Sequence, residues 1–169
     1  MSVPSRLSRP ARPAAQAQPS DAGGTLIFRA TLPGRPSVHR DIEVDARKSL
    51  YDLAVAIVRS FDFDFDHAFG FYRGKTGPTL MRALPRYELF IDMGQATEGA
   101  RSVTGTKIAA AFPRIGHAMT FLFDYGDDWL FNVELRGEGQ KAAGRRYPRT
   151  VAKHGDAPEQ YPALDDDDL

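Results

Sequence analysis

Alternating apolar and polar positions mark two extended segments near the start of the chain. In residues 25–32 every second side chain is apolar, and in residues 38–44 the same spacing recurs with one arginine, Arg40, at an apolar position. Side chains alternate between the two faces of a strand, so both segments are predicted to be strands with one buried face. Residues 33–36 contain two prolines and a glycine, which indicates a turn and hence a hairpin.

From residue 50 onward the apolar side chains adopt the spacing of a helix. The apolar positions on the predicted helix face are Leu50, Leu53, Ala54, Ile57, Val58 and Phe61. Ser49 is suited to cap the N-terminus, and Asp52 three residues later would complete a capping box. We therefore expect a helix over residues 49–60 whose apolar stripe lies on the sheet.

A second hairpin is predicted over residues 121–135, where aromatic side chains recur at every second position. A two-residue loop would place the aromatic residues of the two strands on opposite faces, whereas a three-residue loop places them on one face. We therefore predict that Tyr125 pairs with Trp129 and that Phe123 pairs with Phe131. The hairpin would then have one large aromatic face and a tip that carries carboxylates.

The segments between the two hairpins are less regular. Phenylalanine alternates with aspartate over residues 61–66, which indicates an extended segment with buried aromatic side chains and exposed carboxylates. Residues 68–72 and 87–91 have the pattern of short strands. Residues 106–112 have that of a short helix, which Pro113 would end.

Together these elements predict one compact α+β domain over residues 23–162, in the order ββαβ(β)αββ. The sheet is expected to be mostly antiparallel or mixed, with one main helix packed on one face, and a grasp-like arrangement fits this order. The expected core residues are Trp129, Phe123, Phe131, Phe28, Ile42, Leu53 and Ile57. Residues 1–22 are predicted to be a disordered tail rich in proline and arginine, and residues 163–169 an acidic tail.

Composition and charge limit the classes of function. The chain has no cysteine, which excludes disulfides, thiolate metal sites and cysteine nucleophiles. Its 22 Lys and Arg residues balance 22 Asp and Glu residues, so bulk charge gives no attraction to polyanions. No apolar run approaches the roughly 20 residues that span a membrane. We predict a cytoplasmic protein without membrane association.

Four motifs carry a resemblance to a known family. They are Phe-Asp-Tyr-Gly-Asp-Asp-Trp at 123–129, Tyr-Pro-Arg at 147–149, Gly-Asp-Ala-Pro-Glu-Gln-Tyr-Pro at 155–162, and the Phe-Asp alternation that ends in Asp-His-Ala-Phe at residue 69. In this combination the chain resembles the plasmid Orf3-like proteins, whose name comes from an open reading frame of a root-inducing plasmid. The resemblance covers roughly residues 25–162 and implies a compact α+β domain, with residues 147–149 and 155–162 packed on it as an ordered strap.

The resemblance does not imply an activity, because the family is largely of unknown function. Some members are labelled TnpR-like passengers of transposable elements, which associates the family with mobile elements. A serine recombinase needs its nucleophile inside a folded catalytic domain, whereas Ser2, Ser5 and Ser8 lie in the predicted tail. We therefore reject recombinase activity.

The candidate functional surface is the tip of the second hairpin together with His67. Asp124, Asp127 and Asp128 gather oxygen ligands that a divalent cation would accept, but aspartate also stabilises turns, and we prefer that interpretation and assign no metal. Neighbouring carboxylates would raise the pKa of His67, which is suited either to acid–base chemistry or to holding a loop. Tyr125 and Trp129 flank the turn and complete this surface.

Charges are segregated in the C-terminal part of the chain. Six of the seven ionised residues in 136–153 are basic, and all ionised residues from 156 onward are acidic. The candidate phosphate contacts are Arg145, Arg146, Arg149 and Lys153.

Three hypotheses from different classes remain open. The leading one is a non-catalytic binding or accessory module associated with plasmids or mobile elements, with an unknown protein partner and no cofactor. The second is a nucleic-acid-binding protein that uses the basic segment 136–153. The third is a metal-dependent enzyme that uses the aspartate turn, although no Gly-x-Ser-x-Gly nucleophile motif is present. The sequence does not determine the partner or the oligomeric state.

Overall fold

The computed structural model describes residues 23–74, 76–95 and 97–162. The predicted tails, residues 1–22 and 163–169, lie outside these described residues.

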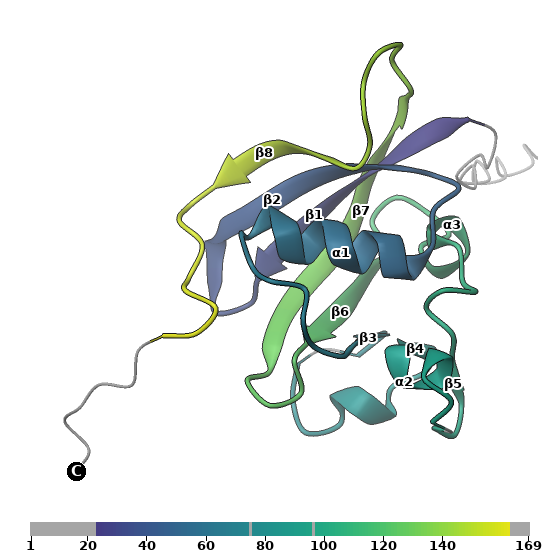
Figure 1. Ribbon diagram of the computed structural model, residues 1–169, viewed down its shortest axis with the longest axis vertical. Helices are drawn as coiled ribbons and strands as arrows, with labels where there is room; N and C mark the ends of the chain where they lie inside the picture. Colours follow the sequence, from purple (N-terminus) through teal and green to yellow (C-terminus); the bar gives the residue numbers. More distant parts are fainter. Residues whose placement is uncertain (1–22, 75, 96, 163–169) are drawn as a thin grey trace, which may run out of the picture.

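One sheet organises the described part of the chain (Figure 1). Its strands are β1 (Gly24–Leu32), β2 (Arg35–Asp45), β3 (Phe69–Tyr72), β4 (Arg86–Glu88), β5 (Ala100–Arg101), β6 (Ala118–Phe123), β7 (Trp129–Gln140) and β8 (Arg149–His154). They lie in the order β5-β4-β3-β6-β7-β1-β2-β8, and the pairs are antiparallel except for β4 and β5. The prediction of a mostly antiparallel sheet in an α+β domain is confirmed.

The long strand β7 joins the two predicted hairpins. Its first half pairs with β6, and from Asn132 onward it also pairs with β1. Because hydrogen bonds along one strand hold both hairpins in register, β1 and β2 continue the same sheet as β6 and β7 rather than forming a second layer.

The main helix, α1 (Leu50–Ser60), lies across one face of the sheet (Figure 1). Its predicted capping box is present: the side chain of Ser49 accepts a hydrogen bond from the Asp52 amide at 3.3 Å, and the Asp52 carboxylate accepts one from the Ser49 amide at 3.0 Å. Leu50, Leu53 and Ile57 are fully buried. The predicted helix and its apolar face are confirmed.

An aromatic core fills the space between α1 and the sheet. Phe28, Phe123 and Phe131 are fully buried, as predicted, and so are Ile42, Leu53 and Ile57. Trp129 was also expected in the core, but it lies at the edge, partly buried and packed edge-on against Phe63 with ring centroids 4.8 Å apart.

Two predicted short elements differ from the structure. The predicted strand 87–91 is only β4, after which the chain turns into the short helix α2 (Leu89–Asp92). The predicted helix 106–112 is reduced to α3 (Ile108–Ala111), and a single 3-10 turn, η1 (Leu80–Arg82), was not predicted. Such short segments are decided by their packing because intrinsic propensity is a weak determinant at this length.

The strand β8 was not predicted, and it extends the sheet beyond β2 (Figure 1). Arg40, which is 3% exposed, ties it to the rest of the domain. Its Nε atom donates to the carbonyl oxygen of Ser60 at 3.0 Å, and Nη1 donates to that of His154 at 2.8 Å. Its guanidinium group lies 4.8 Å above the ring of Phe61. Arg40 stands at an apolar position of the alternating pattern, and hydrogen bonds to backbone carbonyl groups compensate for the burial of its charge.

None of the helices in the described residues is long and apolar enough to cross a membrane.

Candidate functional site

The segment that follows α1 presents carboxylates and one histidine to solvent. Phe61 and Phe63 are buried, whereas Asp62, Asp64 and Asp66 are exposed, as the alternation predicts. Asp62 lies in a turn with a positive φ of 61°, so the alternation of an extended segment applies only from Phe63 onward.

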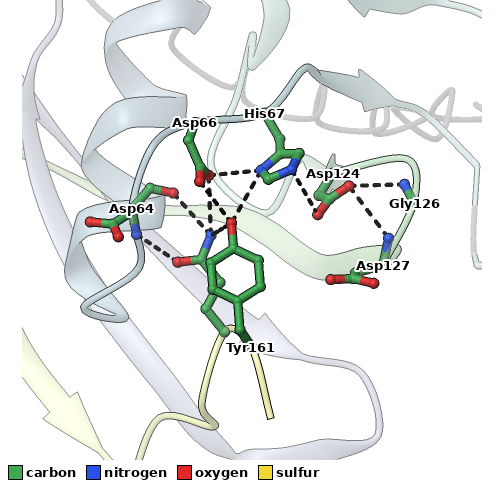
Figure 2. Close-up of polar contacts among 8 residues, drawn as sticks. Asp64, Asp66, His67, Asp124, Gly126, Asp127 and Tyr161 are labelled. Carbon is green, nitrogen blue, oxygen red and sulfur yellow. Dashed lines mark hydrogen bonds and ion pairs between the residues drawn. The ribbon is translucent and has the colours of Figure 1, made fainter. Parts of the chain in front are cut away.

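His67 connects this segment to the turn between β6 and β7 (Figure 2). Its Nδ1 atom lies 2.7 Å from Oδ1 of Asp66, and its Nε2 atom lies 3.5 Å from Oδ2 of Asp124. The hydrogen bond to Asp66 raises the pKa of His67, with further contributions from the charges of Asp124 and Asp127. The structure therefore places His67 beside the aspartate turn.

The C-terminal segment packs against the same cluster (Figure 2). The hydroxyl of Tyr161 donates to Oδ2 of Asp66 at 2.7 Å, and this contact raises the pKa of Tyr161 to about 12. Gln160 accepts a hydrogen bond from the Asp64 amide at 2.7 Å and donates to the Asp64 carbonyl at 3.1 Å. Sequence reasoning placed residues 155–162 in a strap but did not identify Gln160 and Tyr161 as members of this cluster. The Gln-Tyr pair of the family motif was the available signal.

Asp124 has a structural role in its turn. It is 6% exposed, its backbone has a positive φ of 63°, and its Oδ1 atom accepts a hydrogen bond from the Gly126 amide at 2.9 Å. Asp127 and Asp128 are exposed. Among the described residues, no group of three His, Cys, Asp or Glu side chains is arranged to hold a metal ion.

The register of this hairpin differs from the predicted one. Phe123 pairs with Trp129 and Phe121 pairs with Phe131, so the connection is longer than three residues. The predicted pairing is displaced by two positions along β6. A displacement by an even number of residues keeps every side chain on the same face of the sheet. The predicted aromatic face is therefore present although both predicted pairs are wrong.

Tyr125 does not share a face with Trp129. It packs with Tyr72, Leu122 and Leu130 on the side of the sheet that faces away from α1. The longer turn carries Tyr125 out of the strand, so the alternation along the strand no longer fixes its direction. Its predicted pairing with Trp129 is wrong, and its side chain is only partly exposed.

An apolar pocket lies next to the aspartate turn. It has a volume of about 320 Å³, and its walls include Pro33, Arg35, Asp128, Trp129, Leu130 and Pro158. The Nε1 atom of Trp129 is buried and has no hydrogen-bond partner among the residues that the structure describes. A buried N–H group without an acceptor is unfavourable.

The candidate phosphate contacts do not act as one free basic surface. Arg149 forms an ion pair with Glu43 at 2.6 Å, and Lys153 lies 3.7 Å from Asp62. Arg145 and Arg146 are exposed in the connection between β7 and β8.

Comparison with known proteins gives a fold relative and a family. No curated protein matches the chain. The crystal structure of the protein of unknown function MM3350 from Methanosarcina mazei Go1 is similar, with a TM-score of 0.63 and 21% identity over 80% of this chain and 71% of that chain. At this identity the likeness shows a shared fold. The model of the plasmid pRiA4b ORF-3-like protein family matches residues 26–161, so the chain belongs to that family.

Proposed function

We propose that the protein is a non-catalytic binding module that recognises a partner protein at the turn between β6 and β7. The partner segment would present a lysine or arginine beside an apolar side chain. The observation that carries the proposal is that adjacent residues, Asp128 and Trp129, line one apolar pocket beside an exposed acidic turn.

The chemistry of the pocket supports this choice of ligand. Its apolar walls, which include the side chain of Trp129, would bury the apolar side chain of the partner. The exposed carboxylates of Asp127 and Asp128 would attract the neighbouring basic side chain. Tryptophan is enriched among the residues that dominate binding energy at protein interfaces.

The two alternative functions have less support. A metal-dependent enzyme would need Asp124 as a ligand, but Oδ1 of this carboxylate accepts a turn amide and Oδ2 lies beside His67. A nucleic-acid-binding surface would need Arg149 and Lys153, whose charges face Glu43 and Asp62. The plasmid origin in the family's description supports an accessory role in a mobile element, and we place that role in the cytoplasm.

The proposal can be tested with the fluorescence of Trp129, the one tryptophan of the chain. The protein is titrated with short peptides that place leucine beside lysine, and with matched peptides that carry glutamate in place of lysine. We expect the lysine peptides to shift the emission of Trp129 and to bind more tightly. Equal binding of both peptide sets, or an unchanged emission, would contradict the proposal.

Two variants locate the binding surface. Asp127→Asn should weaken binding of the lysine peptide about two- to fivefold, because the lost ion pair is solvent-exposed. Glu138→Gln removes the same charge from an exposed position near the other end of β7 and should leave binding unchanged. If both variants weaken binding equally, the peptide responds to the net charge of the protein and the proposed surface is wrong. If neither variant weakens binding, the proposed surface is also wrong.

A further inference from the structure

Three arginines and a histidine surround a second cavity, which we call the arginine pocket. It has a volume of about 560 Å³ and is lined by Arg73, Arg101, Arg114 and His117. Its apolar wall includes Pro85, Tyr87 and Pro113. The arginine pocket shares no lining residue with the pocket beside Trp129.

The order of the strands assembles the arginine pocket from distant parts of the sequence. Arg73 follows β3, Arg101 lies in β5, and Arg114 comes after α3. β4 pairs with both β3 and β5, while β6, which begins just after His117, pairs with the other edge of β3. The four residues therefore line one cavity although 44 positions separate Arg73 from His117.

The positive charge of the arginine pocket is not compensated. Among the residues that the structure describes, no acidic side chain lines it. Within residues 23–74, 76–95 and 97–162, the side chains of Arg73, Arg101 and Arg114 have no hydrogen bond or ion pair, whereas Arg149 and Arg29 are each paired with a carboxylate. Three guanidinium groups around one cavity repel one another, so an anion between them would be stabilised.

His117 is in the same electrostatic environment. Burial lowers its pKa, and the charges of Arg114 and Arg73 lower it further. Its Nε2 atom is buried and, in the part of the chain that the structure describes, has no hydrogen-bond partner. A bound anion would offset the charges of Arg73 and Arg114 that act on this ring.

We propose that the arginine pocket binds a small organic phosphate, with the phosphate between the arginines and the organic part against the wall at Pro85, Tyr87 and Pro113. Guanidinium groups suit this role because their planar N–H donors match phosphate oxygens in pairs. The volume of about 560 Å³ lies in the range of small-molecule sites, which favours a compact ligand over an extended polymer. This binding function is separate from recognition of a partner protein.

The test is isothermal titration calorimetry of the full chain with three probes: phenyl phosphate, inorganic phosphate and phenol. Phenyl phosphate should bind most tightly, because it supplies both the charge and an apolar ring. Inorganic phosphate should bind about tenfold or more weakly, since burial of an aromatic ring is then lost. Phenol, which lacks the charge, should give no detectable binding. Failure of phenyl phosphate to bind at millimolar concentration would overturn the proposal.

Matched variants identify the site. Arg114→Gln lies in an exposed connection, so the fold should persist, and affinity for phenyl phosphate should fall at least about tenfold. Arg136→Gln removes an exposed arginine from β7 and should leave affinity unchanged. Equal affinity of the two variants would overturn the proposal. A labelled single-stranded oligonucleotide provides a second test. If it binds about tenfold more tightly than phenyl phosphate, and if Arg114→Gln abolishes this binding, the pocket binds nucleic acid and the proposal is overturned.

Discussion

The hydroxyl oxygens of Tyr72 and Tyr125 lie 2.7 Å apart on the face of the sheet opposite α1. Tyr72 donates its proton to Oε1 of Glu88 at 3.0 Å, so Tyr125 is the donor to Tyr72. Burial raises the pKa of both phenols, that of Tyr125 to about 12. Both therefore stay neutral at physiological pH, and this chain of hydrogen bonds joins the turn after β6 to strands β3 and β4.

Gly70 leaves the space that this tyrosine pair occupies. A Cβ atom at Gly70 would lie 2.7 Å from the hydroxyl of Tyr72 and 2.8 Å from that of Tyr125. We expect Gly70→Ala to lower the free energy of unfolding by about 1–3 kcal/mol, measured by urea denaturation. Gly137→Ala is the control, because a Cβ there meets no atom within 4 Å. Similar losses in the two variants would show that close packing at Gly70 is not the cause.

Arg40 should contribute more to stability than a surface arginine. Arg40→Met leaves the carbonyl groups of Ser60 and His154 without their donor, and we expect unfolding to require about 2–4 kcal/mol less. Arg29→Met breaks an ion pair with Asp41 that is partly exposed to solvent, and should cost about 1 kcal/mol or less. Urea denaturation compares the two variants, and a larger loss for Arg29→Met would contradict this account of Arg40.

His67 should titrate above its ordinary pKa of 6.5 because it is hydrogen-bonded to Asp66. A pKa raised in the folded state stabilises the protein below pH 6.5, and this contribution is lost as the pH rises through the folded-state value. NMR titration of the imidazole should give a value above 6.5, and Asp66→Asn should lower it. His67→Gln should reduce stability at pH 5.5 more than at pH 9, and a loss independent of pH would contradict the ion pair.

Ser49 begins the main helix, and its loss should be measurable. Ser49→Ala removes both the hydrogen bond to the Asp52 amide and that to the Asp52 carboxylate, so stability should fall by about 1 kcal/mol. Ser37→Ala is the control. Ser37 is exposed, so this substitution should change stability by less than about 0.5 kcal/mol. A negligible effect at Ser49 in thermal or urea unfolding would show that packing alone fixes the start of α1.

Sequence patterns predicted those elements that local chemistry decides. The apolar spacing and the capping residues of α1 lie within a dozen consecutive positions, and the strand alternation of β1 and β2 is equally local. The predicted register of β6 and β7 was wrong by two positions. The buried face does not distinguish the two registers, because an even shift leaves every side chain on the same face. The strand β8 escaped prediction because its polar sequence becomes a strand only by pairing with the edge of β2.

The sequence by itself determined the fold class, the buried faces, the main helix with its cap, and the exposed aspartates beside His67. Each of these follows from the spacing of residues along one stretch of chain. The tertiary structure decided which surfaces exist: it brought Tyr161 to Asp66, paired Arg149 with Glu43, and gathered Arg73, Arg101 and Arg114 around one cavity. These contacts join residues far apart in sequence, and strand order, which no local pattern encodes, places them together.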